Sequence, residues 1–137
     1  MSNNAKWFTE IESQYRSYFT TRLKKSLPDY SFYFPTEESN STPTKFPTVF
    51  FHEIDQMETG SDLYNDGVNA VMETIEVQVV TNESLAENKD ITATTAVLMK
   101  QLRFSMASAP TYLKEGENIR RSVARYRRII GCDDVVL

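Results

Sequence analysis

The stretch Val71-Met-Glu-Thr-Ile-Glu-Val-Gln-Val-Val80 carries the clearest strand signal in the sequence. Successive side chains of a β-strand point to opposite faces of a sheet, so the apolar residues of this stretch share one face. They are Val71, Ile75, Val77 and Val79, whereas Met72, Thr74, Glu76 and Gln78 make up the other face. Glu73 interrupts the apolar row, and we expect it near the start of the strand, where water reaches it. The pattern predicts a strand with one face in a hydrophobic core.

Three further segments have the β-branched and aromatic composition that is typical of strands. Residues 30–34 form a short candidate that Pro35 closes, and residues 48–54 form a longer one. The last strand is predicted over residues 119–130, where apolar residues and arginines occur on both faces.

Four segments lack this periodicity and predict loops. Residues 36–47 are rich in Ser, Thr, Pro and Glu and predict an exposed loop. Residues 55–70 contain many turn-forming residues and predict a long hairpin connection, a kind of loop that often has a function. Residues 111–118 predict a loop with Gly116, and residues 132–137 predict a short tail.

Two segments show the spacing of three and four residues between apolar positions that marks an amphipathic helix. The first, residues 4–26, carries a strongly aromatic stripe and ends before Pro28. The second, residues 91–108, has Asp90 as its expected N-cap and Pro110 as its end.

Clustered strands flanked by helices predict an α+β fold with two helices packed on an antiparallel or mixed β-sheet, and with a long hairpin loop. The 137 residues of the chain are enough for one hydrophobic core. We therefore expect a single domain over residues 1–137, with exposed loops at 36–47 and 55–70.

The net charge of −4 is an average over three unlike parts. Residues 1–47 carry +1, residues 48–90 carry −9, with one base and ten acids, and residues 91–137 carry +4. The acidic total argues against a dedicated nucleic-acid-binding protein, whose domain is usually basic throughout.

The sequence offers little material for catalysis or for metal binding. It has one cysteine, Cys132, and one histidine, His52, and it contains none of the usual phosphate-loop, nucleophile-elbow or zinc motifs. We therefore expect no enzymatic activity, no metal and no cofactor. No run of about 18 apolar residues predicts a membrane span, and we expect neither a secretory signal nor membrane contact.

One unusual constellation is a set of five arginines near the end of the chain. They are Arg120, Arg121, Arg125, Arg127 and Arg128. On a strand, alternation sends them to both faces, so they form a single patch only if the strand is twisted or lies at an edge. Three interpretations remain open: an edge strand whose charges prevent aggregation, salt bridges to another subunit, and contact with nucleic acid.

The order of these motifs resembles the small tail-terminator (tail completion) proteins of long-tailed bacteriophages. The resemblance covers residues 7–134. Its stretches are Phe46-Pro-Thr-Val-Phe-Phe51, the segment from Asp66 to Asn82, Leu98-Met-Lys-Gln-Leu-Arg-Phe104, and Val123-Ala-Arg-Tyr-Arg-Arg-Ile-Ile-Gly131. They are strand and turn patterns rather than a catalytic signature.

The resemblance implies a structural virion protein. Members of the family form rings, typically hexamers, that cap the tail tube, end its polymerisation and provide the docking surface for the head–tail connector. The implied partners are further copies of the chain, the major tail tube protein, the connector proteins, and genomic DNA that passes through the channel without sequence-specific binding. The implied location is the tail or neck of a virion assembled in the host cytoplasm. The alternative is another neck component, such as a head–tail connector or adaptor, or a subunit like those of the tail tube.

A ring also gives the uneven charge a physical meaning, because a closed ring joins one patch of a subunit to a different patch of the next. Our hypothesis is that acids of the −9 segment face the arginines of a neighbouring copy, a pairing that selects partner and register. The predicted contact residues are Glu53, Asp55, Glu58, Asp62 and Asp66 on the acidic side, and Arg120, Arg121, Arg125, Arg127 and Arg128 on the basic side.

Overall fold

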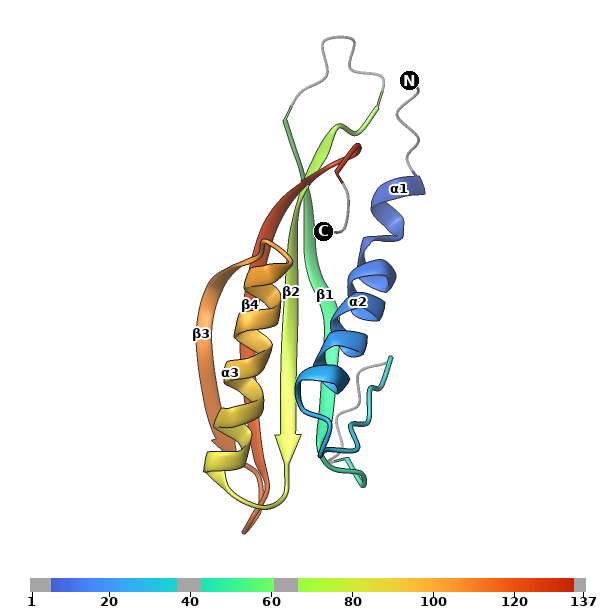
Figure 1. The fold of residues 1–137 in the computed structure, drawn as a ribbon. Coiled ribbons are helices and arrows are strands. Elements are labelled where there is room, and N and C mark those ends of the chain that lie inside the picture. Colours follow the sequence, from blue (N-terminus) through green and yellow to red (C-terminus); the bar gives the residue numbers. More distant parts are fainter. Residues whose placement is uncertain (1–5, 37–42, 61–66, 135–137) are drawn as a thin grey trace.

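The described residues form a four-stranded antiparallel β-sheet with strand order β1-β2-β4-β3. The computed structural model describes residues 6–36, 43–60 and 67–134. The strands are β1 (Thr48–Thr59), β2 (Ala70–Thr81), β3 (Ser105–Lys114) and β4 (Arg120–Gly131). The long strands β2 and β4 lie in the interior of the sheet, and β1 and β3 are its two edges (Figure 1).

In the described part of the chain, three helices accompany the sheet: α1 (Lys6–Thr9), α2 (Ile11–Ser26) and α3 (Leu85–Gln101). Both long helices lie on the same side of the sheet, and α2 follows α1 after a break at Glu10 (Figure 1). The predicted first helix is therefore confirmed over its described part, as two consecutive helical segments.

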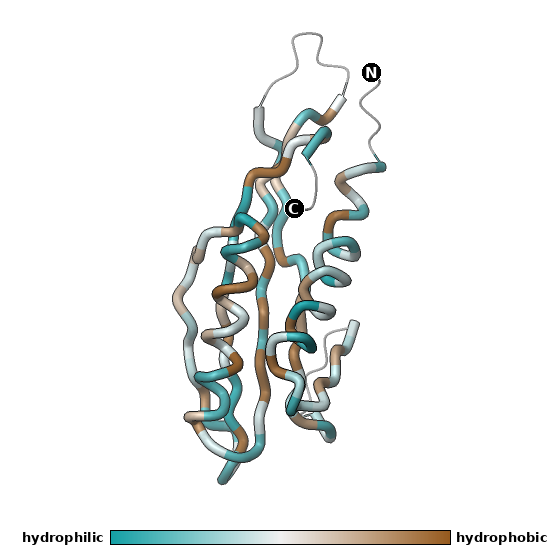
Figure 2. The backbone as a smooth tube through the Cα atoms, in the orientation of Figure 1, coloured by the Kyte–Doolittle hydropathy of each residue, from teal (hydrophilic) through white to brown (hydrophobic). Residues whose placement is uncertain are grey.

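The hydrophobic core fills the space between the two long helices and the sheet. Apolar side chains of α2 and α3 pack there against the inner face of β1, β2 and β4. The predicted apolar face of β2, with Val71, Ile75, Val77 and Val79, is buried in this cluster. Figure 2 shows hydrophobic segments along α2, α3 and β2, while β3 is mostly pale. The α+β class, with two helices packed on an antiparallel sheet, is thus confirmed.

The prediction of a strand over residues 30–34 is wrong. Tyr33 forms an isolated parallel bridge with Thr48, through hydrogen bonds that link it to Pro47 and Val49. The neighbouring rings of Phe32 and Phe34 pack against the core instead. The aromatic alternation therefore reflects packing rather than strand pairing. The described part of the 36–47 loop, residues 43–47, lies outside helices and strands, as predicted.

The boundaries predicted around the second helix are also wrong. Helix α3 begins six residues earlier than expected, because Ser84 is the N-cap and its Oγ accepts a hydrogen bond from the Glu87 backbone at 3.1 Å. The helix ends at Gln101, and residues 105–114, predicted as helix end and loop, form β3. Pro110 lies inside this strand. A proline is tolerated on an edge strand, where its missing N–H need not pair with a neighbour.

The predicted hairpin connection over residues 55–70 is shorter than expected. Strand β1 continues to Thr59 and β2 begins at Ala70, with a bulge between Glu53 and Asp55. Residues 55–59 pair with β2 as an edge strand, although turn-forming residues are frequent in the segment as a whole. Residues 61–66 of the predicted loop lie outside the described residues. Within the described ranges, no helix has the length and apolar character needed to cross a bilayer.

Candidate functional site

The candidate functional site is the face of the sheet that is not covered by any helix of the described residues, and β4 supplies its charge. Alternate residues of β4, from Ser122 to Ile130, are buried under the helices. The residues between them point to the other face, which we call the helix-free face. They are Arg121, Val123, Arg125, Arg127 and Ile129. Three of the five predicted arginines therefore form one stripe on a single face.

This placement corrects two expectations about the arginines. Strand β4 lies between β2 and β3, so its arginines do not protect an exposed edge. Arg128 is directed to the helix side, where it is 8% exposed and donates hydrogen bonds to the Tyr15 hydroxyl at 2.7 Å and the Leu102 carbonyl at 2.9 Å. Arg120 donates to backbone carbonyls of the preceding loop, among them that of Glu117. Neither side chain belongs to the stripe.

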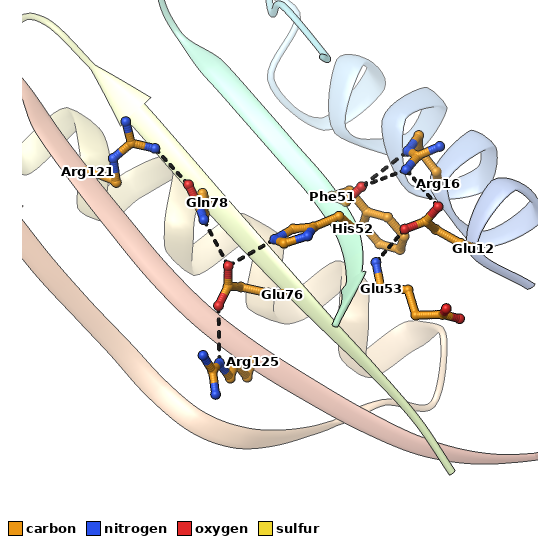
Figure 3. A network of polar contacts seen from close by, with 9 residues as sticks. All are labelled: Glu12, Arg16, Phe51, His52, Glu53, Glu76, Gln78, Arg121 and Arg125. Carbon is orange, nitrogen blue, oxygen red and sulfur yellow. Dashed lines mark hydrogen bonds and ion pairs between the residues drawn. The ribbon is translucent and has the colours of Figure 1, made fainter. Parts of the chain in front are cut away.

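Glu76 lies on the central strand β2, in the middle of the helix-free face, and forms polar contacts with side chains of β1, β2 and β4. Its Oε1 lies 2.9 Å from His52 Nε2 on β1 and accepts a hydrogen bond from Gln78 at 2.8 Å. Its Oε2 accepts from Arg125 on β4 at 3.1 Å (Figure 3). Burial alone raises the pKa of Glu76, but the bonds from Gln78, His52 and Arg125 outweigh it and hold the pKa below its ordinary value. The ionised carboxylate therefore joins three strands.

The network continues toward the lower end of the sheet. Gln78 Oε1 accepts a hydrogen bond from Arg121 at 2.6 Å, and Arg121 also forms an ion pair with Glu115 at 2.6 Å. Figure 3 shows the line from Arg121 through Gln78 and Glu76 to Arg125. Such linked charge-assisted bonds hold the side chains in fixed positions, so the face is a preformed surface.

Two straight rows of side chains cross the upper end of the helix-free face. Asp55 and Arg127 pair with Thr74 from opposite sides, and Arg127 Nε donates to the Thr74 hydroxyl at 3.4 Å. In the next row, Met57 and Ile129 flank Met72. Met57 and Ile129 are each 57% exposed. The face thus combines acid, base and exposed apolar groups within two neighbouring rows.

The acidic candidates lie on the edge strand β1. Glu53, Asp55 and Glu58 are all exposed. The backbone N–H of Glu53 donates to the carboxylate of Glu12 on α2, and Gln56 donates to the Glu53 carboxylate at 3.2 Å. The remaining predicted acids, Asp62 and Asp66, lie outside the described residues.

Glu73 occupies a different place from the one predicted. It is fully buried on the helix side of β2, with 0% exposure, and is not at a wet strand end. Its Oε1 accepts a hydrogen bond from Gln56 at 2.8 Å, while Oε2 has no partner among the described atoms. Burial, and secondarily the neighbouring carboxyl of Glu53, raise the pKa of Glu73 to about 9. At neutral pH this carboxyl is therefore protonated.

The chain's histidine and cysteine, His52 and Cys132, both lie among residues that pack or hydrogen-bond within the fold. The ring of His52 stacks on Phe50 with centroids 4.2 Å apart and is held by Glu76. Cys132 is half-buried beside the turn that follows β4. Among the described residues, no group of three or more His, Cys, Asp or Glu side chains is arranged to hold a metal ion.

Sequence reasoning missed the role of Glu76 and the partnership of His52 with it. The alternation of β2 predicted the face on which Glu76 lies, but its partners depend on the register of β1 and β4. Comparison with known proteins adds nothing to this assignment: no protein-family model matches the chain, and no curated protein matches it either.

Proposed function

We propose that this chain is a structural virion protein that forms a ring at the end of a phage tail tube, ends the tube's polymerisation and provides a docking surface for the head–tail connector. The ring on this proposal is a homo-oligomer, a hexamer on the pattern of the family that the sequence resembles. The chain acts through surfaces rather than through a catalytic centre.

One observation carries the proposal: a single protomer presents two unlike charged surfaces. An exposed acidic edge on β1, with Asp55 and Glu58, lies two strands away from an arginine stripe on β4, with Arg125 and Arg127. A closed ring needs this arrangement, because each interface joins two different patches. A symmetric dimer would need one self-complementary patch instead.

The arginine stripe is only partly available to a neighbouring molecule. Arg121 and Arg125 are bound to Glu115 and Glu76, whereas Arg127 has only the hydroxyl of Thr74 as hydrogen-bond acceptor among the described residues. Because two of the three arginines of the stripe already pair with carboxylates of the chain and Arg127 alone does not, the stripe is unsuited to tight DNA binding. This supports a role in which DNA passes without sequence-specific binding.

The direct test is the oligomeric state and shape of the purified full-length chain. We expect native mass spectrometry to give one closed assembly, and negative-stain images to show rings with a central hole. Added to polymerising tail tube subunits, the rings should cap the tubes and shorten them. A strict monomer at high concentration, or rings that leave tube length unchanged, would refute the proposed function.

A further inference from the structure

The upper end of the sheet has a notch where β3 stops before β4 does. The first pair between these strands is Ser105 with Arg127, yet β4 continues to Gly131. Residues 128–131 of β4 are therefore flanked by β2 on one side and have no strand from β3 on the other. Figure 1 shows β4 rising beyond the beginning of β3 at this place.

A cavity of about 600 Å³ occupies this notch. Its walls combine cationic and apolar groups, and a hydroxyl from Ser105 lies among them. The lining residues that matter here are Met72, Met106, Ile129, Arg103 and Arg127. Neither Arg103 nor Arg127 forms an ion pair within residues 6–36, 43–60 and 67–134. The notch therefore suits a ligand that carries both carboxylates and apolar side chains.

The part of β1 that follows its bulge, residues 55–59, carries both carboxylates and an apolar side chain. Asp55 is an exposed acid, and Met57 on the same face is exposed and apolar, whereas the exposed Glu58 lies on the helix side. This segment follows the bulge between Glu53 and Asp55, and β1 is an edge strand with a neighbour on one side, β2. The acidic strand and the basic notch lie at opposite edges of the same sheet, so they cannot meet within one protomer.

The register of the sheet places the two surfaces at the same height. Asp55 and Arg127 belong to one cross-strand row, and Met57 and Ile129 belong to the next. Strands β1 and β4 also run in the same direction, because each is antiparallel to β2. Rotating a copy about an axis along the strands would therefore bring its Asp55 level with Arg127, and its Met57 level with Ile129, of the first copy.

We propose that the notch is the socket for β1 of a second copy of this chain, with Asp55 facing Arg127 and Arg103, and Met57 packing on Ile129. The inference rests on the proposed ring and names the interface that closes it. The contact is heterologous, because the notch and strand β1 are different parts of the protomer. Each copy offers one notch and one β1 strand. The apolar part of the cavity wall favours this occupant over DNA, which would bind the arginines by its phosphates alone.

Cysteine cross-linking tests the contact directly. In a Cys132→Ser background, Met57→Cys and Ile129→Cys are combined in one chain and oxidised. Within a protomer the two positions are separated by β2, about 9–10 Å apart, too far for a disulfide. We expect disulfide-linked oligomers on a non-reducing gel, ending at the size of the closed ring. Lys114→Cys in place of Ile129→Cys is the matched control, because Lys114 is exposed at the far end of β3.

Charge exchange provides a second readout. Arg127→Glu and Asp55→Arg should each weaken association at least about tenfold, and combining them in one chain should restore it. Lys114→Glu makes the same charge change as Arg127→Glu away from the notch and should leave association unchanged.

The outcomes separate this inference from the proposed function. Rings of the Met57→Cys/Ile129→Cys chain that gain no disulfide on oxidation, or rings that tolerate Arg127→Glu, would overturn the socket and leave the proposed ring protein standing. Cross-linked rings that fail to cap tail tubes would support the socket and refute the tail function. Loss of DNA binding by Arg127→Glu with unchanged association would show that the notch serves nucleic acid, and it would overturn the inference.

Discussion

Glu73 on β2 and Arg128 on β4 face each other directly across the sheet, both buried under the helices, yet they bind different partners. Arg128 donates to Tyr15 and to the Leu102 carbonyl, and Glu73 accepts from Gln56. The core therefore holds a cation bound by two neutral oxygens, with the Asp134 carboxylate 3.8 Å away, beside a carboxyl that burial keeps protonated. This arrangement ties α2, the end of α3 and the sheet together by polar contacts.

Adjacent arginines on β4 should differ sharply in their effect on stability. Arg128→Ala leaves the Tyr15 hydroxyl and the Leu102 carbonyl without their buried donor, so we expect a loss of about 2 kcal/mol or more in the free energy of unfolding. Arg127→Ala removes an exposed side chain and should change the value by no more than about 0.5 kcal/mol. Urea denaturation of both variants makes the comparison. Equal losses would contradict the assignment of the two side chains to opposite faces.

Glu73 should make the protein less stable as the pH rises. Its pKa is raised from 4.5 to about 9 in the folded chain. Between these values the unfolded chain has released the proton and the folded chain keeps it, so the free energy of unfolding falls with increasing pH. Glu73→Gln imitates the protonated carboxyl and should flatten this decline, with a gain of about 1 kcal/mol or more at pH 8.

The matching control is Glu117→Gln, which changes the same chemical group at an exposed position. It should leave the pH profile of thermal unfolding parallel to that of the wild type. A Glu73→Gln profile parallel to the wild type would show that Glu73 is ionised in the folded chain.

The start of α3 offers a direct comparison of two caps. Ser84→Ala removes the hydroxyl that accepts from the Glu87 backbone, and it should cost about 1 kcal/mol. Asp90→Ala, at the cap expected from the sequence, lies inside the helix and should not carry this penalty. Thermal unfolding of the two variants decides between the positions, and a larger loss at Asp90 would place the cap there.

Replacing Arg103 should raise the stability of the monomer and weaken its self-association. It lies directly after α3 and adopts a left-handed backbone with φ of 69°, where glycine is the preferred residue. Arg103→Gly relieves a strain of about 1 kcal/mol, so the monomer should unfold at a higher temperature. The same change removes a cation from the notch and should weaken self-association. A variant with lower stability and unchanged association would contradict both expectations.

The sequence predicted the parts of the fold in which local pattern and tertiary packing agree. The alternation over Val71 to Val80 located β2 to within one residue at each end, and the apolar spacing of the first helix located α2. The strand containing the arginines was also predicted correctly. In each case one face is buried along the whole element, so the hydrophobic pattern follows the period of the backbone.

The sequence did not predict elements that bury little apolar surface, or residues whose type fits two structures, as a proline fits both a helix end and an edge strand. Strand β3 is exposed along almost its whole length, so it has no apolar face that would reveal it, and Pro110 in the sequence predicts a helix end instead. The site was predicted as a list of charges, and five of the ten lie on β4. Their division between the core and the helix-free face follows from alternation. Their partners, such as Glu76 for Arg125, follow from strand register, which is not encoded locally.

Strand β4 also places two kinds of structural environment along one segment. Its buried positions, such as Tyr126 and Arg128, meet the core, so exchanges there alter whether the chain folds. The intervening positions, such as Arg127 and Ile129, meet whatever lies outside. Mutations at alternate residues of β4 can therefore change its outward-facing surface while the core stays as it is.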